Sequence, residues 1–143
     1  MENQVKLQPE GVFHYFAEIC KIPRPSKKEE KIMTYLKDFG HKHGLETHED
    51  KAGNVLIKKP ATPGFENRKV VILQAHTDMV CEKNKDTQHD FEKDPIQTFI
   101  DGEWLRAQGT TLGADNGIGI AMALALLAAN DIQHGPIECL FTV

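Results

Sequence analysis

Apolar residues recur every three or four positions in segment 10–20, the spacing that places them on one face of an α-helix. Pro23 follows that segment, and proline disfavours the helical conformation in the residue before it. Ser26 and Glu29 then have the spacing of a capping box, in which a hydroxyl and a carboxylate satisfy the free amides at a helix start. The pattern therefore predicts two helices, the second running from this box towards Gly44.

Short runs suited to β-strands come next. Segments 45–48 and 54–58 lie on either side of a turn that contains Gly53. Segment 70–74 begins with four apolar residues without polar alternation, which is typical of a strand buried on both faces. After a Gly-Pro break, segment 137–143 has the composition of another strand.

The middle of the chain predicts a long loop followed by a helix. Residues 81–98 are polar and show no period, so we expect a long loop there, and such loops often serve function. Residues 100–104 suit a small hairpin, and the apolar, Ala-rich segment 116–129 predicts a helix buried against a sheet. The order of elements predicts an α/β fold with a mixed β-sheet flanked by helices.

Composition narrows the classes of function. Of the 143 residues, 40% are hydrophobic and 27% charged, as is typical of a soluble globular domain. The net charge of −4, with mixed signs, argues against binding to nucleic acid. The amino terminus lacks the pattern of a secretory signal, and the longest apolar-rich stretch, 118–129, is too short to span a membrane. Three scattered cysteines, Cys20, Cys81 and Cys139, predict free thiols in a reducing compartment and thus a cytoplasmic protein.

The first candidate for chemistry is the pair His76 and Asp78, which comes directly after strand 70–74. Ligands of open α/β sheets bind beyond the carboxyl ends of strands, so a histidine in this place points towards a cleft. Asp78 can hydrogen-bond the second ring nitrogen, which is how metal-binding histidines are oriented. By itself, the pair also fits a structural histidine beside a turn.

The second candidate is Asp115, which lies in the glycine-rich run 109–117 at the start of the predicted helix. The run matches neither of the common phosphate-binding glycine patterns. A carboxylate at this place can cap the helix, or it can present its oxygens to metal ions. His76 and Asp115 are expected at the same edge of one sheet, so together they predict a metal site. Two metal ions about 3.5–4 Å apart can share one carboxylate, a common arrangement for hydrolysis.

Five segments match a known family, and together they cover nearly the whole chain: Ile22–Ser26, Ala52–Ile57, Leu73–Val80, His89–Ile96 and Gly109–Gly117. They resemble the M20 family of zinc peptidases, which includes aminoacylases, glutamate-type carboxypeptidases and bacterial dipeptidases. The last segment is the most specific, since it is typical of a dipeptidase branch that cleaves dipeptides ending in histidine (Xaa-His).

The resemblance implies a role for each candidate residue. His76 would bind one zinc ion, Asp115 would bridge two, and Asp78 would orient His76 and tune the site. The peptide bond between Asp115 and Asn116 would be cis. A metal-bound water would attack the scissile carbonyl of a small dipeptide. The expected cofactors are two divalent metals, with zinc first and with cobalt and manganese suited to overlapping ligand sets.

The resemblance also implies a domain organisation. Residues 1–143 would be the amino-terminal part of a zinc-exopeptidase catalytic domain of the phosphorylase/hydrolase-like kind. A Glu-Glu pair, as general base and metal ligand, would follow Val143, and a lid or dimerisation domain would come later. The chain stops inside a predicted strand, so we expect a piece of a longer protein. The resemblance implies that the whole enzyme is a homodimer and that this piece, without the general base and the remaining ligands, is inactive by itself.

Two further expectations concern this chain alone. A non-catalytic peptide-binding or structural protein without bound metal is the alternative to an enzyme. Missing elements would leave an apolar edge, so we expect self-association through strand 137–143.

Overall fold

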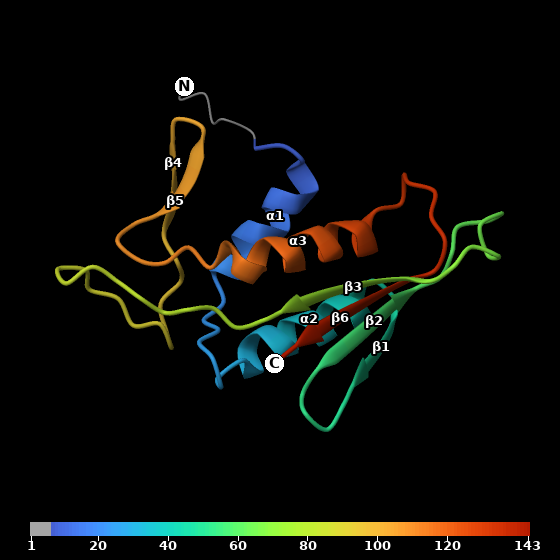
Figure 1. Ribbon diagram of the computed structural model, residues 1–143, viewed down its shortest axis with the longest axis horizontal. Coiled ribbons are helices and arrows are strands. Elements are labelled where there is room, and N and C mark those ends of the chain that lie inside the picture. The colour runs from blue at the N-terminus through green and yellow to red at the C-terminus, as the bar shows by residue number, and fades with distance from the viewer. Residues whose placement is uncertain (1–6) are drawn as a thin grey trace.

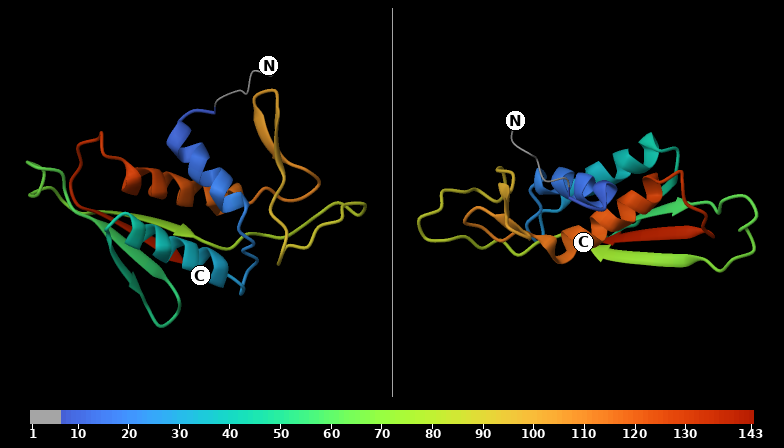
Figure 2. Two further views of the ribbon diagram at one scale, coloured as in Figure 1. Left: turned by 180° about the vertical axis from the view of Figure 1, so that it is seen from behind. Right: turned by 90° about the horizontal axis from the view of Figure 1, so that it is seen from above.

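The computed structural model describes residues 7–143, which form a four-stranded sheet, a separate two-stranded hairpin and three helices. The helices lie together on one face of the four-stranded sheet, and the hairpin stands apart at one end (Figure 1, Figure 2). None of the helices in this range has the length and apolar character needed to cross a membrane. The predicted α/β class with a mixed sheet is confirmed.

The large sheet has the order β1-β2-β6-β3. β1 (Glu46–Glu49), β2 (Val55–Lys59) and β6 (Ile137–Thr142) pair antiparallel, whereas β3 (Val71–His76) runs parallel to β6. Parallel strands need a crossover connection, and the helix α3 lies within the one that joins β3 to β6. In the parallel pair His76 lies opposite Thr142, so both strands end at the same edge of the sheet.

The helices are α1 (Glu10–Cys20), α2 (Glu30–Lys42) and α3 (Ala114–Ala128). The core lies between these helices and the sheet, because alternate strand residues point towards the helices. In β6 the inward-facing residues are buried and the others are only half-buried. The fully buried side chains of the core include Ile19, Ile32, Leu36, Ile57, Ile120, Leu124, Cys139 and Phe141.

The strand predicted to be buried on both faces is an edge strand, so that prediction is wrong. Val71 and Ile72 of β3 are 53% and 63% exposed. Within residues 7–143, helices cover only one face of the sheet, which leaves the second apolar face of this strand open. An apolar open edge is present, but its expected location at strand 137–143 is wrong: β6 is paired on both sides, by β2 and β3, and the edge strand is β3.

The capping box predicted before the second helix is also wrong. α2 begins at Glu30, and no side chain caps its start. Ser26 Oγ donates a hydrogen bond to Asp78, and Glu29 accepts one from the backbone N–H of Lys27. The hydroxyl therefore serves a contact between distant segments of the chain.

The other predicted elements are confirmed with shifted boundaries. α1 matches helix 10–20, and α3 begins two residues before the predicted start at residue 116. The hairpin consists of β4 (Thr98–Asp101) and β5 (Trp104–Ala107), joined through Gly102 at a φ of +61°. The three cysteines are free thiols, as predicted.

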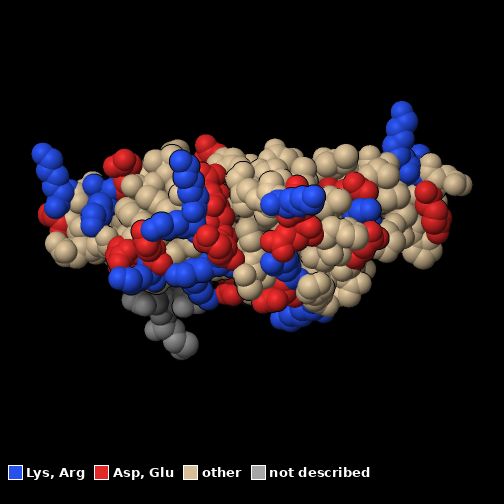
Figure 3. Space-filling view, turned by 90° about the horizontal axis from the view of Figure 1, so that it is seen from below, with Lys and Arg blue, Asp and Glu red and all other residues tan. Residues whose placement is uncertain are grey.

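Charged side chains of both signs stand side by side on the face shown in Figure 3. In one of the surface ion pairs, Lys37 Nζ lies 2.7 Å from Glu49 Oε2. Exposed pairs of this kind stabilise a protein by about 0–1 kcal/mol each. Surface charge thus contributes little to holding the fold together compared with the core.

Candidate metal site

His76 is the last residue of β3, and each nitrogen of its ring faces a carboxylate. Nδ1 lies 2.8 Å from Oδ1 of Asp78, and Nε2 lies 2.9 Å from Oδ1 of Asp115. Only the imidazolium ion can donate to both carboxylates at once, because the neutral ring carries a single N–H. Partial burial lowers the pKa of His76, but the hydrogen bonds to Asp115 and Asp78 outweigh burial, and the net pKa is raised.

Both oxygens of Asp78 are engaged. Oδ1 faces His76, and Oδ2 accepts a hydrogen bond from Ser26 Oγ. The bond from Ser26 lowers the pKa of Asp78; partial burial opposes it, and the bond from His76 adds to it. Asp78 therefore stays ionised and fixes the ring of His76 in one orientation.

Asp115 lies in the first turn of α3, where its backbone departs from helical φ and ψ. The peptide bond between Asp115 and Asn116 is cis, as the family resemblance implies. The Asp115 side chain is 95% exposed, and among the described residues no side chain caps the start of α3. The helix-cap interpretation of Asp115 is thus wrong, and its carboxylate faces His76 instead.

Arg24 is a residue of this site that the sequence analysis missed. It lies between α1 and α2 and is only 2% exposed. Nη1 donates to the carbonyl oxygens of Thr77 and Asp78, at 3.0 and 3.1 Å, and Nη2 donates to that of Gly113, at 2.6 Å. Burial lowers the pKa of Arg24, yet a guanidinium remains charged in proteins. The only local sign of its importance was its place between Pro23 and Pro25, in one of the five segments that resemble the peptidase family.

Thr77 anchors the segment that follows β3. Its N–H and its Oγ1 both donate to the carbonyl oxygen of Thr142, each at 2.9 Å. Two residues further on, the N–H of Met79 donates to the carbonyl oxygen of Arg24 at 3.1 Å. His76 and Asp78 are therefore held from two sides, by β6 and by the segment around Arg24.

Known proteins of similar sequence and structure share this arrangement of elements. The cytosol non-specific dipeptidase of Escherichia coli (strain K12) is 54% identical over 143 residues, which are all of this chain and 30% of that protein. The crystal structure of aminoacylhistidine dipeptidase from Vibrio alginolyticus matches with a TM-score of 0.94 and 57% identity, over 96% of this chain and 28% of that one. The chain is thus similar to dipeptidases over its whole length. The resemblance predicted from the sequence is thus confirmed.

The chain matches only part of the length of these relatives, and a more distant peptidase shares its fold. This chain spans about 30% of the length of the E. coli relative. A Bacillus subtilis protein described as a dinuclear metal binding peptidase from the M20 family has a TM-score of 0.55 at 15% identity, over 91% of this chain and 34% of that one. At that identity the match shows a shared fold alone. No family model matches the chain.

The side chains of His76 and Asp115 are chemically suited to bind a divalent metal ion. His76 and Asp115 offer an imidazole nitrogen and carboxylate oxygens, which are donor types that zinc accepts. Two nitrogen or oxygen atoms that bind the same zinc ion are each about 2.0–2.2 Å from it, and the two atoms therefore lie within about 4 Å of each other. The 2.9 Å between Nε2 of His76 and Oδ1 of Asp115 satisfies that condition. Within residues 7–143, no group of three or more His, Cys, Asp or Glu residues is arranged to hold a metal ion.

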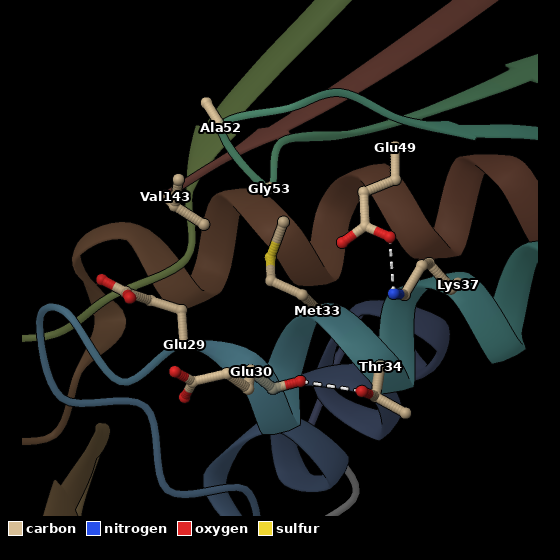
Figure 4. Close-up of a pocket in the computed structure, with 9 residues that line it drawn as sticks. All are labelled: Glu29, Glu30, Met33, Thr34, Lys37, Glu49, Ala52, Gly53 and Val143. Carbon is tan, nitrogen blue, oxygen red and sulfur yellow. Dashed lines mark hydrogen bonds and ion pairs between the residues drawn. The ribbon is translucent and has the colours of Figure 1, made fainter.

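A cavity lies at the same edge of the sheet (Figure 4). It is bounded by the start of α2, the turn between β1 and β2, and Val143. Val143 follows Thr142, the residue opposite His76, so the cavity and the candidate metal site lie at the same edge of the sheet. His76 itself does not line the cavity, and its side chain is 41% exposed. The candidate metal ligands therefore lie outside this hollow, on an exposed part of the surface.

Proposed function

We propose that this chain supplies part of the active site of a dipeptidase that uses two divalent metal ions. The observation that carries the proposal is the ring of His76, which Asp78 holds at one nitrogen and which has Asp115 2.9 Å from the other. The names of two relatives, cytosol non-specific dipeptidase and aminoacylhistidine dipeptidase, support hydrolysis of dipeptides.

Each residue has a distinct part in this proposal. His76 and Asp115 would bind the metal ions, and Asp115 would bridge them through its two carboxylate oxygens. Asp78 accepts the Nδ1–H of His76, so that once Nε2 has lost its proton its lone pair would be available to a metal ion. When bound, the metal ions polarise the scissile carbonyl and lower the pKa of a bound water.

The finer assignments follow the same comparison. We propose zinc as the metal, with cobalt and manganese as ions that suit the same ligands. The substrate class is small dipeptides, including those that end in histidine, in keeping with the name of the Vibrio enzyme. The longer protein would act in the cytoplasm, in keeping with the name of the E. coli relative, and as a homodimer.

The 143-residue chain alone is expected to be inactive. Two ligands, His76 and Asp115, are too few to hold two metal ions, and residues 7–143 contain no group of three or more His, Cys, Asp or Glu residues arranged to hold one. The alternative for this chain is a non-catalytic peptide-binding or structural protein without bound metal. The two functions are separated by metal content.

The test uses the full-length gene product with His76→Ala and Asp115→Asn. We expect about two metal ions per wild-type chain by mass spectrometry, and hydrolysis of Xaa-His dipeptides. Each variant is expected to lose more than about 100-fold in kcat/KM, since replacing even an outer residue of a metal site costs about 10- to 100-fold.

His48→Ala is the matched control for these variants. His48 also faces a carboxylate, since its Nε2 lies 2.6 Å from Glu46 Oε1, but it lies on β1, at the far edge of the sheet. It should leave metal content and hydrolysis unchanged. A wild-type protein without metal, or equal activity in all variants, would contradict the proposal.

A further inference from the structure

We infer that Arg24 is a positioning residue of the metal site, whose guanidinium sets the separation between the segment of His76 and Asp78 and the turn that carries Asp115. The inference rests on the proposed function, because it concerns metal affinity at the same site. Arg24 itself touches neither His76 nor Asp115; it acts through the backbone beside them.

The guanidinium stands between the two segments. On one side it donates to the carbonyl oxygens of Thr77 and Asp78, and on the other side to that of Gly113, two residues before Asp115. A guanidinium is planar, and its N–H groups have fixed directions. One rigid group therefore bridges two loops that approach each other from β3 and from α3.

Two glycines make room for this group. A Cβ atom added to Gly113 would lie 2.7 Å from Nη2 of Arg24, and one added to Gly117 would lie equally close, at 2.7 Å. Gly113 also has a φ of +73°, which favours glycine in any case, but Gly117 has no such requirement. The glycine at 117 is thus explained by the close approach of the guanidinium.

Packing alone accounts poorly for a buried arginine here. Desolvating a guanidinium is costly, and an apolar side chain of similar volume would fill the same space at a lower cost. All three hydrogen bonds described for the guanidinium go to backbone carbonyl oxygens. Its contacts therefore fix the course of the backbone, as expected of a positioning group.

The same short segment makes further contacts with the residues after β3. Ser26 Oγ donates to Asp78, and the carbonyl oxygen of Arg24 accepts the N–H of Met79. Residues 24–26 therefore hold both the backbone around Asp78 and its side chain. Displacing Arg24 is expected to disturb His76 and Asp115 together.

The test compares Arg24→Lys and Arg24→Met with the wild type in the full-length gene product. Zinc is titrated into the metal-free protein against a chelating dye, and thermal unfolding of the metal-free protein is recorded separately. Lysine keeps the charge but lacks the fork of N–H groups, so both variants are expected to bind zinc about 10- to 100-fold more weakly. A merely structural role would lower thermal stability and leave zinc affinity unchanged.

Lys59→Met is the matched control. Lys59 is also a part-buried cation that donates to two backbone carbonyl oxygens, those of Leu126 and Ala129, at the opposite end of α3. Its loss is expected to lower thermal stability without a change in zinc affinity. Equal losses of zinc affinity in Lys59→Met and Arg24→Lys would overturn the inference, because any weakened contact would then have the same effect.

Gly117→Ala is a second variant, which leaves the arginine at position 24 unsubstituted. It tests the inference if the Arg24 variants do not fold. The added methyl group must displace Nη2, so zinc affinity is expected to fall by about tenfold or more. If the wild type binds no zinc, the proposed function fails and this inference with it. If the wild type binds zinc and Arg24→Lys or Gly117→Ala binds it equally well, only this inference fails.

Discussion

The residues that shape the candidate site act over long separations in sequence. Ser26 reaches Asp78 across 52 positions, and Arg24 reaches Gly113 across 89. Each contact ends on or beside a residue proposed to serve the metal ions. Mutations of Arg24 or Ser26, in the segment between α1 and α2, should therefore alter the geometry of the candidate metal site, although neither residue is proposed as a metal ligand.

Two buried cysteines make the stability of the chain depend on pH. Burial raises the pKa of Cys20 to about 11 and that of Cys139 to about 12, although Arg24 and Lys59, respectively, oppose the shift. In the unfolded chain the same thiols ionise near 9.0. The folded state thus retains protons that the unfolded state has released, so the free energy of unfolding falls as pH rises above that value.

The expected size of this fall is about 1.4 kcal/mol per pH unit for each thiol, up to the pH at which the folded thiol itself ionises. Urea unfolding at about pH 8 and about pH 10 measures it. Cys139→Ala should lose less stability than the wild type between these two pH values. Equal losses in both proteins would show that the Cys139 thiol is not protected.

At the scale of elements, α2 packs so closely on β1 that only glycine fits at position 40. A Cβ atom added to Gly40 would lie 2.1 Å from Oγ1 of Thr47. We expect Gly40→Ala to lower the free energy of unfolding by about 1–3 kcal/mol, even though alanine favours a helix over glycine by about 1 kcal/mol. Urea unfolding of the chain measures the change.

Gly11→Ala is the control for this prediction, since Gly11 is also in a helix. Its added Cβ atom would meet only Ala125 Cβ, at an ordinary 3.7 Å. This variant is expected to stabilise the chain by about 0.4–1 kcal/mol. If Gly40→Ala were as stable as Gly11→Ala, the close contact between α2 and β1 would not be a determinant of stability.

The sequence predicted those elements whose determinants are local. The periodic apolar residues of α1 and the turn at Gly102 act within a few positions, and both elements lie where the pattern placed them. The burial of β3 was misjudged because an apolar run indicates a strand but not what covers its second face. Whether that face is covered depends on helices or strands that are distant from β3 in the sequence.

The candidate site shows the same division. His76, Asp78 and Asp115 were found because each follows a strand or opens a helix, and the structure brings all three together. Arg24 was missed, and Ser26 was assigned to a helix cap, because their partners are distant in sequence. A local pattern cannot separate a capping hydroxyl from one that reaches across the fold.

At the scale of the whole molecule, the sheet is covered on one face and open at β3 (Figure 2). Val70, Val71 and Ile72 are 49%, 53% and 63% exposed along this edge. An edge strand presents unpaired N–H and C=O groups that can pair with a strand of another chain. Self-association, first expected at β6, is therefore predicted at β3.

We predict that the 143-residue chain forms dimers or larger assemblies that grow with concentration, measured by light scattering. Ile72→Lys should shift the chain towards monomers, because a charge on an edge strand opposes pairing. Trp104→Lys is the control, since Trp104 is 68% exposed but lies on the separate β4–β5 hairpin. A response confined to Ile72→Lys would assign association to β3, whereas an equal response would point to apolar surface in general. A strictly monomeric wild-type chain would contradict the prediction.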